Sequence, residues 1–309
     1  MSGDQPTATP PGTGGVFATA VTEDHVRQVS DVMTWHTADY ITPICVVLSH
    51  ECGELLGTGT FLRLNGTPYI LTNEHVARVR LTHSLSHFGG DEQRSVYRIV
   101  HPFFCITDPT DAAITRLDEQ VAKRIARDVF PSVRFEPSYA PAHGEILFIH
   151  GYPGVNSRFS ALAAGVLTRT LPFATPEVPL PPIPDKYDPA IHFALGYPMN
   201  LTLTNALGQP VQLPDPHGLS GTLVWDTKFV AKAAASAQWC PQHSRACGLV
   251  FAWEAAYHCL VCTRVEYVRS FMLQALRQEA AYFHWADRGR PQGDDLTDWF
   301  HAEVTVVDI

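Results

Sequence analysis

The sequence lacks the features that mark nucleic-acid-binding, membrane-spanning and secreted proteins. It has no long run of Lys and Arg, and its net charge of -9 opposes binding to a phosphate backbone. No apolar stretch approaches the roughly 20 residues that cross a bilayer, and the N-terminus lacks the basic and apolar regions of a secretory signal. We therefore expect a cytoplasmic protein with no nucleic-acid or membrane partner.

Cysteine is scarce and its count is odd. Seven thiols suit a reducing compartment better than a disulfide framework, so we expect buried reduced thiols and no metal or organic cofactor. One alternative is a zinc-stabilised interaction module, because four thiols and one imidazole have plausible ligand spacing. Another alternative is a loop disulfide between Cys240 and Cys247 under oxidising conditions. The side chains concerned are those of Cys240, Cys247, Cys259, Cys262 and His243.

Short apolar segments separated by turn residues recur along the 309 residues and predict an all-β protein. Asn65-Gly66 lies between two such segments and predicts a tight hairpin, because both residues tolerate positive φ. Apolar residues at helical spacing predict one helix over about 22–33 and another over about 265–285. Residues 171–190 contain seven prolines, so we expect a long loop or interdomain connection there.

Three segments carry the residue types of nucleophilic catalysis. His75 comes just after an apolar strand-like segment, Asp111 directly precedes another, and Ser220 lies between glycines in His217-Gly-Leu-Ser-Gly221. A serine hydroxyl needs a base that takes its proton, and the base needs a partner that fixes its tautomer. Asp108 is a nearby alternative to Asp111 for that partner. Backbone N–H groups of this tight loop would stabilise the oxyanion.

These segments resemble the trypsin-like (chymotrypsin-fold) serine proteases, of the bacterial intracellular type. The matching motifs occur in the family's order: Gly57-Thr-Gly-Thr-Phe61, Leu71-Thr-Asn-Glu-His75, Asp111-Ala-Ala-Ile-Thr-Arg-Leu117 and Gly218-Leu-Ser-Gly221. The resemblance implies a serine endopeptidase that cleaves a protein or peptide substrate through an acyl-enzyme. It assigns catalysis to His75, Asp111 and Ser220, and the oxyanion hole to the N–H groups of Gly218 and Ser220.

The sequence departs from the family pattern at three positions near the expected site. Val76 follows the histidine where secreted members have a disulfide-bonded cysteine, which favours the intracellular bacterial type. Leu219 replaces the usual acidic residue before the nucleophile, and Thr222 replaces a glycine after it. Because oxyanion loops in this family can rest in an inactive form, a latent enzyme that awaits an activating partner protein stays open. By analogy with stand-alone bacterial members of the family, a role as a defence effector also stays open.

The resemblance also implies an architecture of two six-stranded antiparallel β-barrels with N-terminal and C-terminal helices. We expect a flexible leader, a helical segment, a first barrel with His75 and Asp111, a second barrel with Ser220, and a C-terminal helix and tail. Asp215 and Glu254 are expected near the substrate pocket, where they would favour a basic substrate residue. A catalytically silent peptide-binding protein is the main alternative function. The expected boundaries are 1–16, 17–38, 39–137, 138–265 and 266–309.

Overall fold

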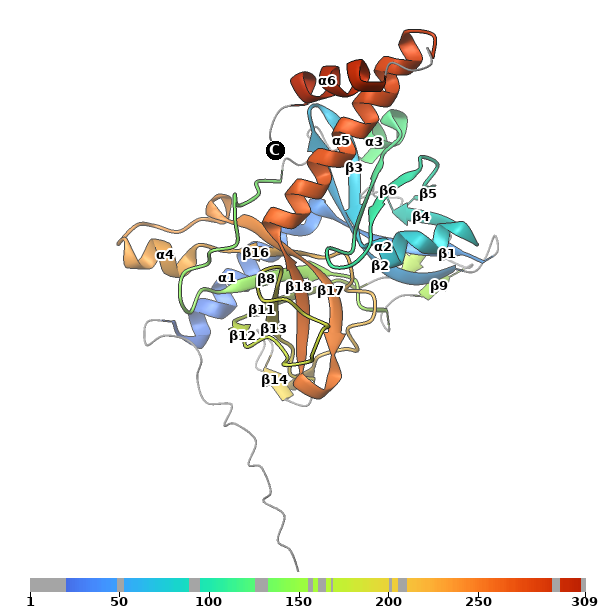
Figure 1. Ribbon diagram of the computed structural model, residues 1–309. Coiled ribbons are helices and arrows are strands. Elements are labelled where there is room, and N and C mark those ends of the chain that lie inside the picture. The colour runs from blue at the N-terminus through green and yellow to red at the C-terminus, as the bar shows by residue number, and fades with distance from the viewer. Residues whose placement is uncertain are drawn as a thin grey trace, which may run out of the picture.

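Two seven-stranded antiparallel sheets form the body of the protein in the computed structural model (Figure 1). Their strand orders are β5-β4-β1-β2-β3-β7-β6 and β11-β8-β16-β17-β18-β13-β12. Helices precede the first sheet and follow the second, so the predicted all-β architecture with terminal helices is confirmed. The structure describes residues 21–48, 53–88, 95–125, 133–154, 158–160, 165–167, 169–199, 202–204, 210–290 and 295–306.

The first sheet contains the strands of the N-terminal half. Its hairpin between β2 and β3 turns at Asn65 (φ 47°) and Gly66 (φ 79°), as the sequence predicts. Both residues have the left-handed backbone that a tight hairpin turn requires. The strands are β1 (Ile41–Val47), β2 (Gly53–Leu64), β3 (Thr67–Thr72), β4 (Ser84–Phe88), β5 (Val96–Arg98), β6 (Phe103–Ile106) and β7 (Ala112–Arg116).

The second sheet contains the strands of the C-terminal half. Two separate hairpins, β9 with β10 and β14 with β15, accompany it among the described residues. The sheet strands are β8 (Leu147–Gly151), β11 (Leu171–Thr175), β12 (Glu177–Val178), β13 (His192–Gly196), β16 (Leu223–Asp226), β17 (Arg245–Glu254) and β18 (Cys259–Arg264). The hairpin strands are β9 (Arg158–Ser160), β10 (Gly165–Leu167), β14 (Thr202–Thr204) and β15 (Pro210–Gln212).

Two expectations about the strands need correction. Each sheet has seven strands and not six, because strands of two to four residues such as β5, β6 and β12 extend the sheet edges. The proline-rich stretch is not wholly a loop, because β11 and β12 form the two edges of the second sheet. Proline is tolerated at an edge, where one side of the strand has no hydrogen-bonding neighbour.

The predicted N-terminal helix is α1 (Glu23–Thr37). Its first turn is capped by Thr22, whose Oγ1 accepts a hydrogen bond from the backbone N–H of His25 at 3.3 Å. Val29 and Met33 are fully buried on one face of the helix. They belong to a core cluster that also contains Tyr69 of β3 and Phe148 of β8, so α1 contributes to a hydrophobic core that it shares with both sheets.

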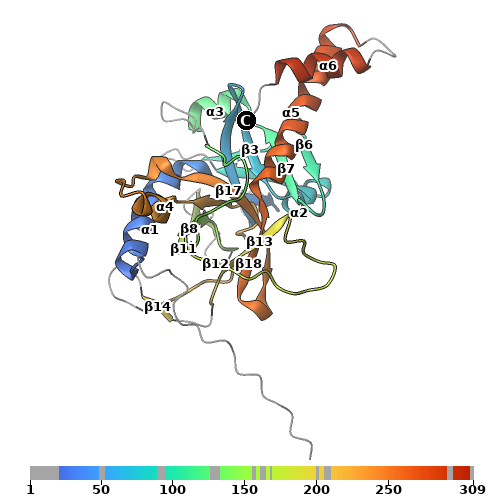
Figure 2. The same cartoon turned by 60° about the vertical axis from the view of Figure 1, so that its left-hand side comes forward.

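The predicted C-terminal helix is α5 (Val265–Asp287), which rises from the end of β18 along the first sheet toward α6 (Figure 1 and Figure 2). Val268 and Met272 of α5 join the same cluster as α1, which therefore ties both sheets and both terminal helices together. The helix α6 (Asp295–Thr305) was not predicted. The remaining helices are α2 (Glu74–Ala77), α3 (Glu119–Ile125), α4 (Phe229–Ala234), and the 3-10 turns Ala38–Tyr40, Arg78–Leu81, Pro241–His243 and Ala255–Tyr257.

The strands of the first sheet fall within 39–137 and those of the second within 138–265. The domain boundaries themselves stay a prediction, and the leader expected at 1–16 lies outside the described residues. Among the helices that the structure describes, none is both long and apolar enough to cross a membrane.

Candidate active site

His75 lies in the short helix α2, directly after β3. Asn73 has an extended backbone (φ -87°, ψ 157°) and follows the strand, so the chain turns into α2 at the C-terminal end of β3. The side chain of His75 is 44% exposed. An imidazole in this position is fixed at its base and open to an incoming molecule, as a general base must be.

Asp111 holds His75 through two hydrogen bonds. Its Oδ2 lies 2.6 Å from His75 Nδ1, and its Oδ1 accepts the backbone N–H of His75 at 3.1 Å. The carboxylate side chain is only 10% exposed. Because an ionised carboxylate only accepts hydrogen bonds, His75 Nδ1 carries the proton and Nε2 is left as the basic atom. Sequence reasoning singled out both residues, and the structure brings them together.

The backbone at Asp111 adopts the left-handed conformation, with φ 44°. Two hydrogen bonds, one from each half of the chain, hold the loop in this conformation. Asn73 Nδ2 donates to Asp111 O at 2.6 Å, and Thr263 Oγ1 of β18 donates to Thr110 O at 2.9 Å. A strand of the second sheet therefore fixes the loop that carries the acid of the first.

His192 of β13 adds a second bond across the sheets. Its Nε2 lies 2.8 Å from Pro109 O, while its Nδ1 accepts the backbone N–H of Asp188 at 3.0 Å. Since Nδ1 accepts, the proton lies on Nε2 and is donated to the carbonyl. Sequence reasoning missed His192, Thr263 and Asn73, because only the strand register places them beside the Asp111 loop.

Ser220 lies in a tight loop between two glycines with positive φ, Gly218 (96°) and Gly221 (88°). Leu219 N and Gly221 N donate to backbone carbonyls at 2.9 Å each. The N–H groups of Gly218 and Ser220 have no hydrogen-bond partner among the described residues. Two unused donors, one on the serine itself and one two residues before it, are what an oxyanion hole requires.

Gly57 of β2 lies between Ser220 and α2, the helix that contains His75. A Cβ atom at Gly57 would lie 2.7 Å from Val76 Cγ2 and 3.0 Å from Ser220 O, so only glycine fits between them. Within the described residues, no hydrogen bond joins Ser220 to His75. Catalytic hydrogen bonds are often long before substrate binds, so the lack of this bond does not argue against a catalytic pair.

A cavity of about 200 Å³ opens beside Ser220, and its walls are mostly apolar. They come from the loop before Ser220 and from β17 and β18. The lining residues are Pro216, His217, Leu219, Ser220, Val250, Phe251, Ala252, Trp253 and Leu260.

Comparison with solved structures finds chains of similar fold. In fold, the chain resembles trypsin-like serine proteases. The Rv3671c protease from M. tuberculosis in its active form is 16% identical, with a TM-score of 0.43 over 86% of this chain and 93% of that one. Deg5 is 15% identical, with a TM-score of 0.46 over 81% of this chain and 93% of that one. A Glu endopeptidase is 15% identical, with a TM-score of 0.43 over 77% and 90%.

Sequence comparisons add one local match. A family described as "Protein of unknown function (DUF2934)" matches residues 278–306, which include the end of α5 and all of α6. No curated protein matches the chain. The chemistry of the site therefore rests on its own geometry.

Asp215 and Glu254 do not line the cavity. Asp215 accepts hydrogen bonds from the backbone and ring of His217, which lower its pKa although partial burial opposes this. Glu254 accepts from Lys186 Nζ and Tyr187 OH at 2.5 Å each, and these bonds outweigh burial and lower its pKa. The structure does not bring either carboxylate together with Ser220, and their role in binding a basic residue stays a prediction.

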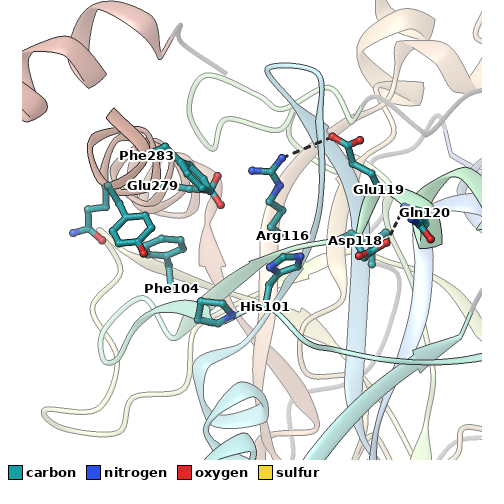
Figure 3. A pocket seen from close by; sticks show the side chains of 12 residues that line it. His101, Phe104, Arg116, Asp118, Glu119, Gln120, Glu279 and Phe283 are labelled. Carbon is teal, nitrogen blue, oxygen red and sulfur yellow. Dashed lines mark hydrogen bonds and ion pairs between the residues drawn. The ribbon is translucent and has the colours of Figure 1, made fainter. Parts of the chain in front are cut away.

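A larger cavity of about 770 Å³ lies between the first sheet and α5 (Figure 3). Arg116 projects into it, 5.6 Å from the ring of Phe283 and 3.9 Å from Glu119. None of the three predicted catalytic residues lines it. Of those three residues, Ser220 lines the smaller cavity.

The thiols proposed as zinc ligands do not converge. Cys247 and Cys262 are fully buried, and burial raises the pKa of both well above the ordinary thiol value. Cys240 Sγ lies 3.5 Å from His243 Nδ1. Within the part of the chain that the structure describes, no three metal-binding side chains lie close enough to share an ion.

Proposed function

We propose that the protein is a serine endopeptidase, with His75 as the general base, Asp111 as its partner and Ser220 as the nucleophile. The observation that carries the proposal is the pair of hydrogen bonds from His75 to Asp111, at 2.6 Å and 3.1 Å, which fixes the tautomer of the base. The loop with two unused N–H donors around Ser220 supports it independently.

The reaction would proceed by acyl transfer. His75 Nε2 takes the proton of Ser220 Oγ, which attacks the substrate carbonyl, and the N–H groups of Gly218 and Ser220 stabilise the oxyanion. The protonated His75 then gives its proton to the departing amine, which leaves an ester on Ser220. Water, deprotonated by the same histidine, attacks the ester and releases the carboxylic acid. The cycle ends with the proton returned to Ser220.

The cavity beside Ser220 supports a preference for an apolar residue before the scissile bond. Most of its walls are apolar side chains, and the carboxylates of Asp215 and Glu254 are engaged elsewhere. A charged side chain buried there would have no opposite charge to compensate its lost hydration. A volume of about 200 Å³ suits one side chain of moderate size.

We therefore expect cleavage of a diverse peptide library to occur mainly after apolar residues. The measurement is mass-spectrometric profiling of the products, with Ser220→Ala protein as the blank. Enrichment of Lys or Arg before the cut would contradict the apolar preference and favour the earlier expectation that Asp215 and Glu254 bind a basic residue.

The nucleophile itself is tested with a fluorophosphonate probe, which esterifies only an activated serine. We expect labelling of the wild-type protein at Ser220, located by peptide mass spectrometry, and complete loss in Ser220→Ala. His75→Ala should reduce labelling by at least about 10³-fold, since triad members act as a unit. Half-buried Ser95 offers a comparison serine, and Ser95→Ala should label like the wild type.

A catalytically silent peptide-binding protein is the second candidate. It is favoured by one observation, the missing hydrogen bond between Ser220 and His75 in the described residues. Folded wild-type protein that takes up no fluorophosphonate, yet binds peptides as well as Ser220→Ala does, would replace the first proposal with this one.

A further inference from the structure

Thr58 of β2 connects the nucleophile loop to a second turn through its hydroxyl. The residue is fully buried. Its Oγ1 donates to Gly218 O at 2.8 Å and accepts the backbone N–H of Tyr152 at 2.9 Å. The hydroxyl thus donates one hydrogen bond to the loop of Ser220 and accepts one from the turn at Tyr152.

The backbone of Thr58 holds the same loop at a second point. Its N–H donates to Ser220 O at 2.8 Å, and its own carbonyl accepts Thr72 Oγ1 at 2.8 Å. One residue of the first sheet therefore contacts the carbonyl oxygens of both Gly218 and Ser220. These are the two residues whose N–H groups are left without partners.

The turn at Tyr152 completes the arrangement. Gly154 N, two residues along, donates to His217 O at 2.5 Å. The carbonyl and N–H of a trans peptide point in opposite directions, so this bond fixes the direction of the Gly218 N–H. The Thr58 hydroxyl, through Tyr152 N, joins that turn to the loop.

We propose that Thr58 is a positioning residue for the oxyanion hole, and that its hydroxyl holds the Gly218 and Ser220 N–H groups in their catalytic direction. The inference rests on the proposed function for its catalytic meaning. Its structural content, a hydroxyl that fixes the nucleophile loop, can be tested without any reaction.

Thr58→Val keeps the shape of the side chain and removes the hydroxyl. Gly218 O and Tyr152 N then lose a partner in a buried place, and the loop must shift to find another. Thr58→Ser retains the hydroxyl. Thr60 offers a matched control, because it is a buried threonine two residues along the same strand whose Oγ1 has no partner in the described residues.

The first measurement is the second-order rate of fluorophosphonate labelling, with kcat and KM for a p-nitrophenyl ester alongside. We expect Thr58→Val to lower the labelling rate and kcat about 10²-fold, the scale of losing one oxyanion donor, with KM little changed. Thr58→Ser and Thr60→Val should stay within about threefold of the wild type. Equal rates for Thr58→Val and Thr60→Val, or an equal fall for Thr58→Ser, would overturn the proposal.

Hydrogen exchange measured by mass spectrometry provides a readout that does not depend on activity. Peptides that cover residues 151–154 and 216–222 should exchange at least about tenfold faster in Thr58→Val, and unchanged in Thr60→Val. If the wild type takes no label, the proposed function fails and exchange alone decides the positioning role. Unchanged exchange of both segments in Thr58→Val would refute that role even in an active enzyme.

Discussion

Replacing Asp111 by asparagine should lower kcat by about 10⁴-fold while the protein stays folded. The amide has one acceptor oxygen, whereas the carboxylate accepts two N–H groups of His75, at 2.6 Å and 3.1 Å. The imidazole would then turn to the tautomer with its proton on Nε2, which cannot take a proton from Ser220. Asparagine also tolerates the positive φ of 44° at this position, so the backbone need not change.

The experiment compares burst-phase hydrolysis of a p-nitrophenyl ester by the wild type and by Asp111→Asn. Asp108→Asn is the matched control, because Asp108 is the neighbouring acid that the sequence left as an alternative. Circular dichroism and thermal midpoints show whether each variant is folded. If Asp111→Asn keeps more than a tenth of the activity, or if Asp108→Asn has the larger effect, Asp111 is not the partner of the base.

Gly221→Ala should destabilise the protein and abolish most of its activity. A Cβ atom there would lie 2.1 Å from Thr58 O and 2.5 Å from Thr72 Oγ1, and the residue has φ 88°. The left-handed backbone costs an L-residue about 1–2 kcal/mol, and crowding a packed site adds about 1–3 kcal/mol. The strand and the nucleophile loop must separate to accept the methyl group, so labelling of Ser220 should fall at least about 10²-fold.

Gly66→Ala separates the two causes. Gly66 has a similar φ of 79°, but a Cβ atom there would meet nothing within 4 Å. We expect this variant to lose about 1–2 kcal/mol of unfolding free energy in urea and to label like the wild type. A Gly221→Ala protein as stable and as reactive as Gly66→Ala would show that the close contact with Thr58 is not present in solution.

The sequence predicted the parts of this structure that depend on neighbouring residues. The Asn65-Gly66 hairpin and the helices α1 and α5 follow from turn chemistry and helical spacing within short windows. His75 and Asp111 were identified because each lies at the end of an apolar strand, and antiparallel pairing of β3 with β7 brings those ends together.

The features that the sequence did not predict depend on contacts between distant segments. Thr58 was noticed within a glycine motif, but nothing local indicates that its hydroxyl bonds residues 160 positions away. His192 follows a proline-rich stretch, and only the register of β13 against β18 turns it toward Pro109. The number of prolines likewise argued against strands in 171–190, and this was wrong for β11 and β12. A proline count does not show whether a strand lies at the edge or the centre of a sheet.

The bonds between the two sheets run in both directions. Thr58 of the first sheet holds the loop of Ser220, while Thr263 and His192 of the second hold the loop of Asp111. Neither half can complete its own share of the site alone, so reactivity requires both to be folded and docked. During synthesis, the first sheet leaves the ribosome before β13 and β18 exist. Under the proposed function, a nascent chain therefore has no complete active site, and hydrolysis would report that the last strand is in place.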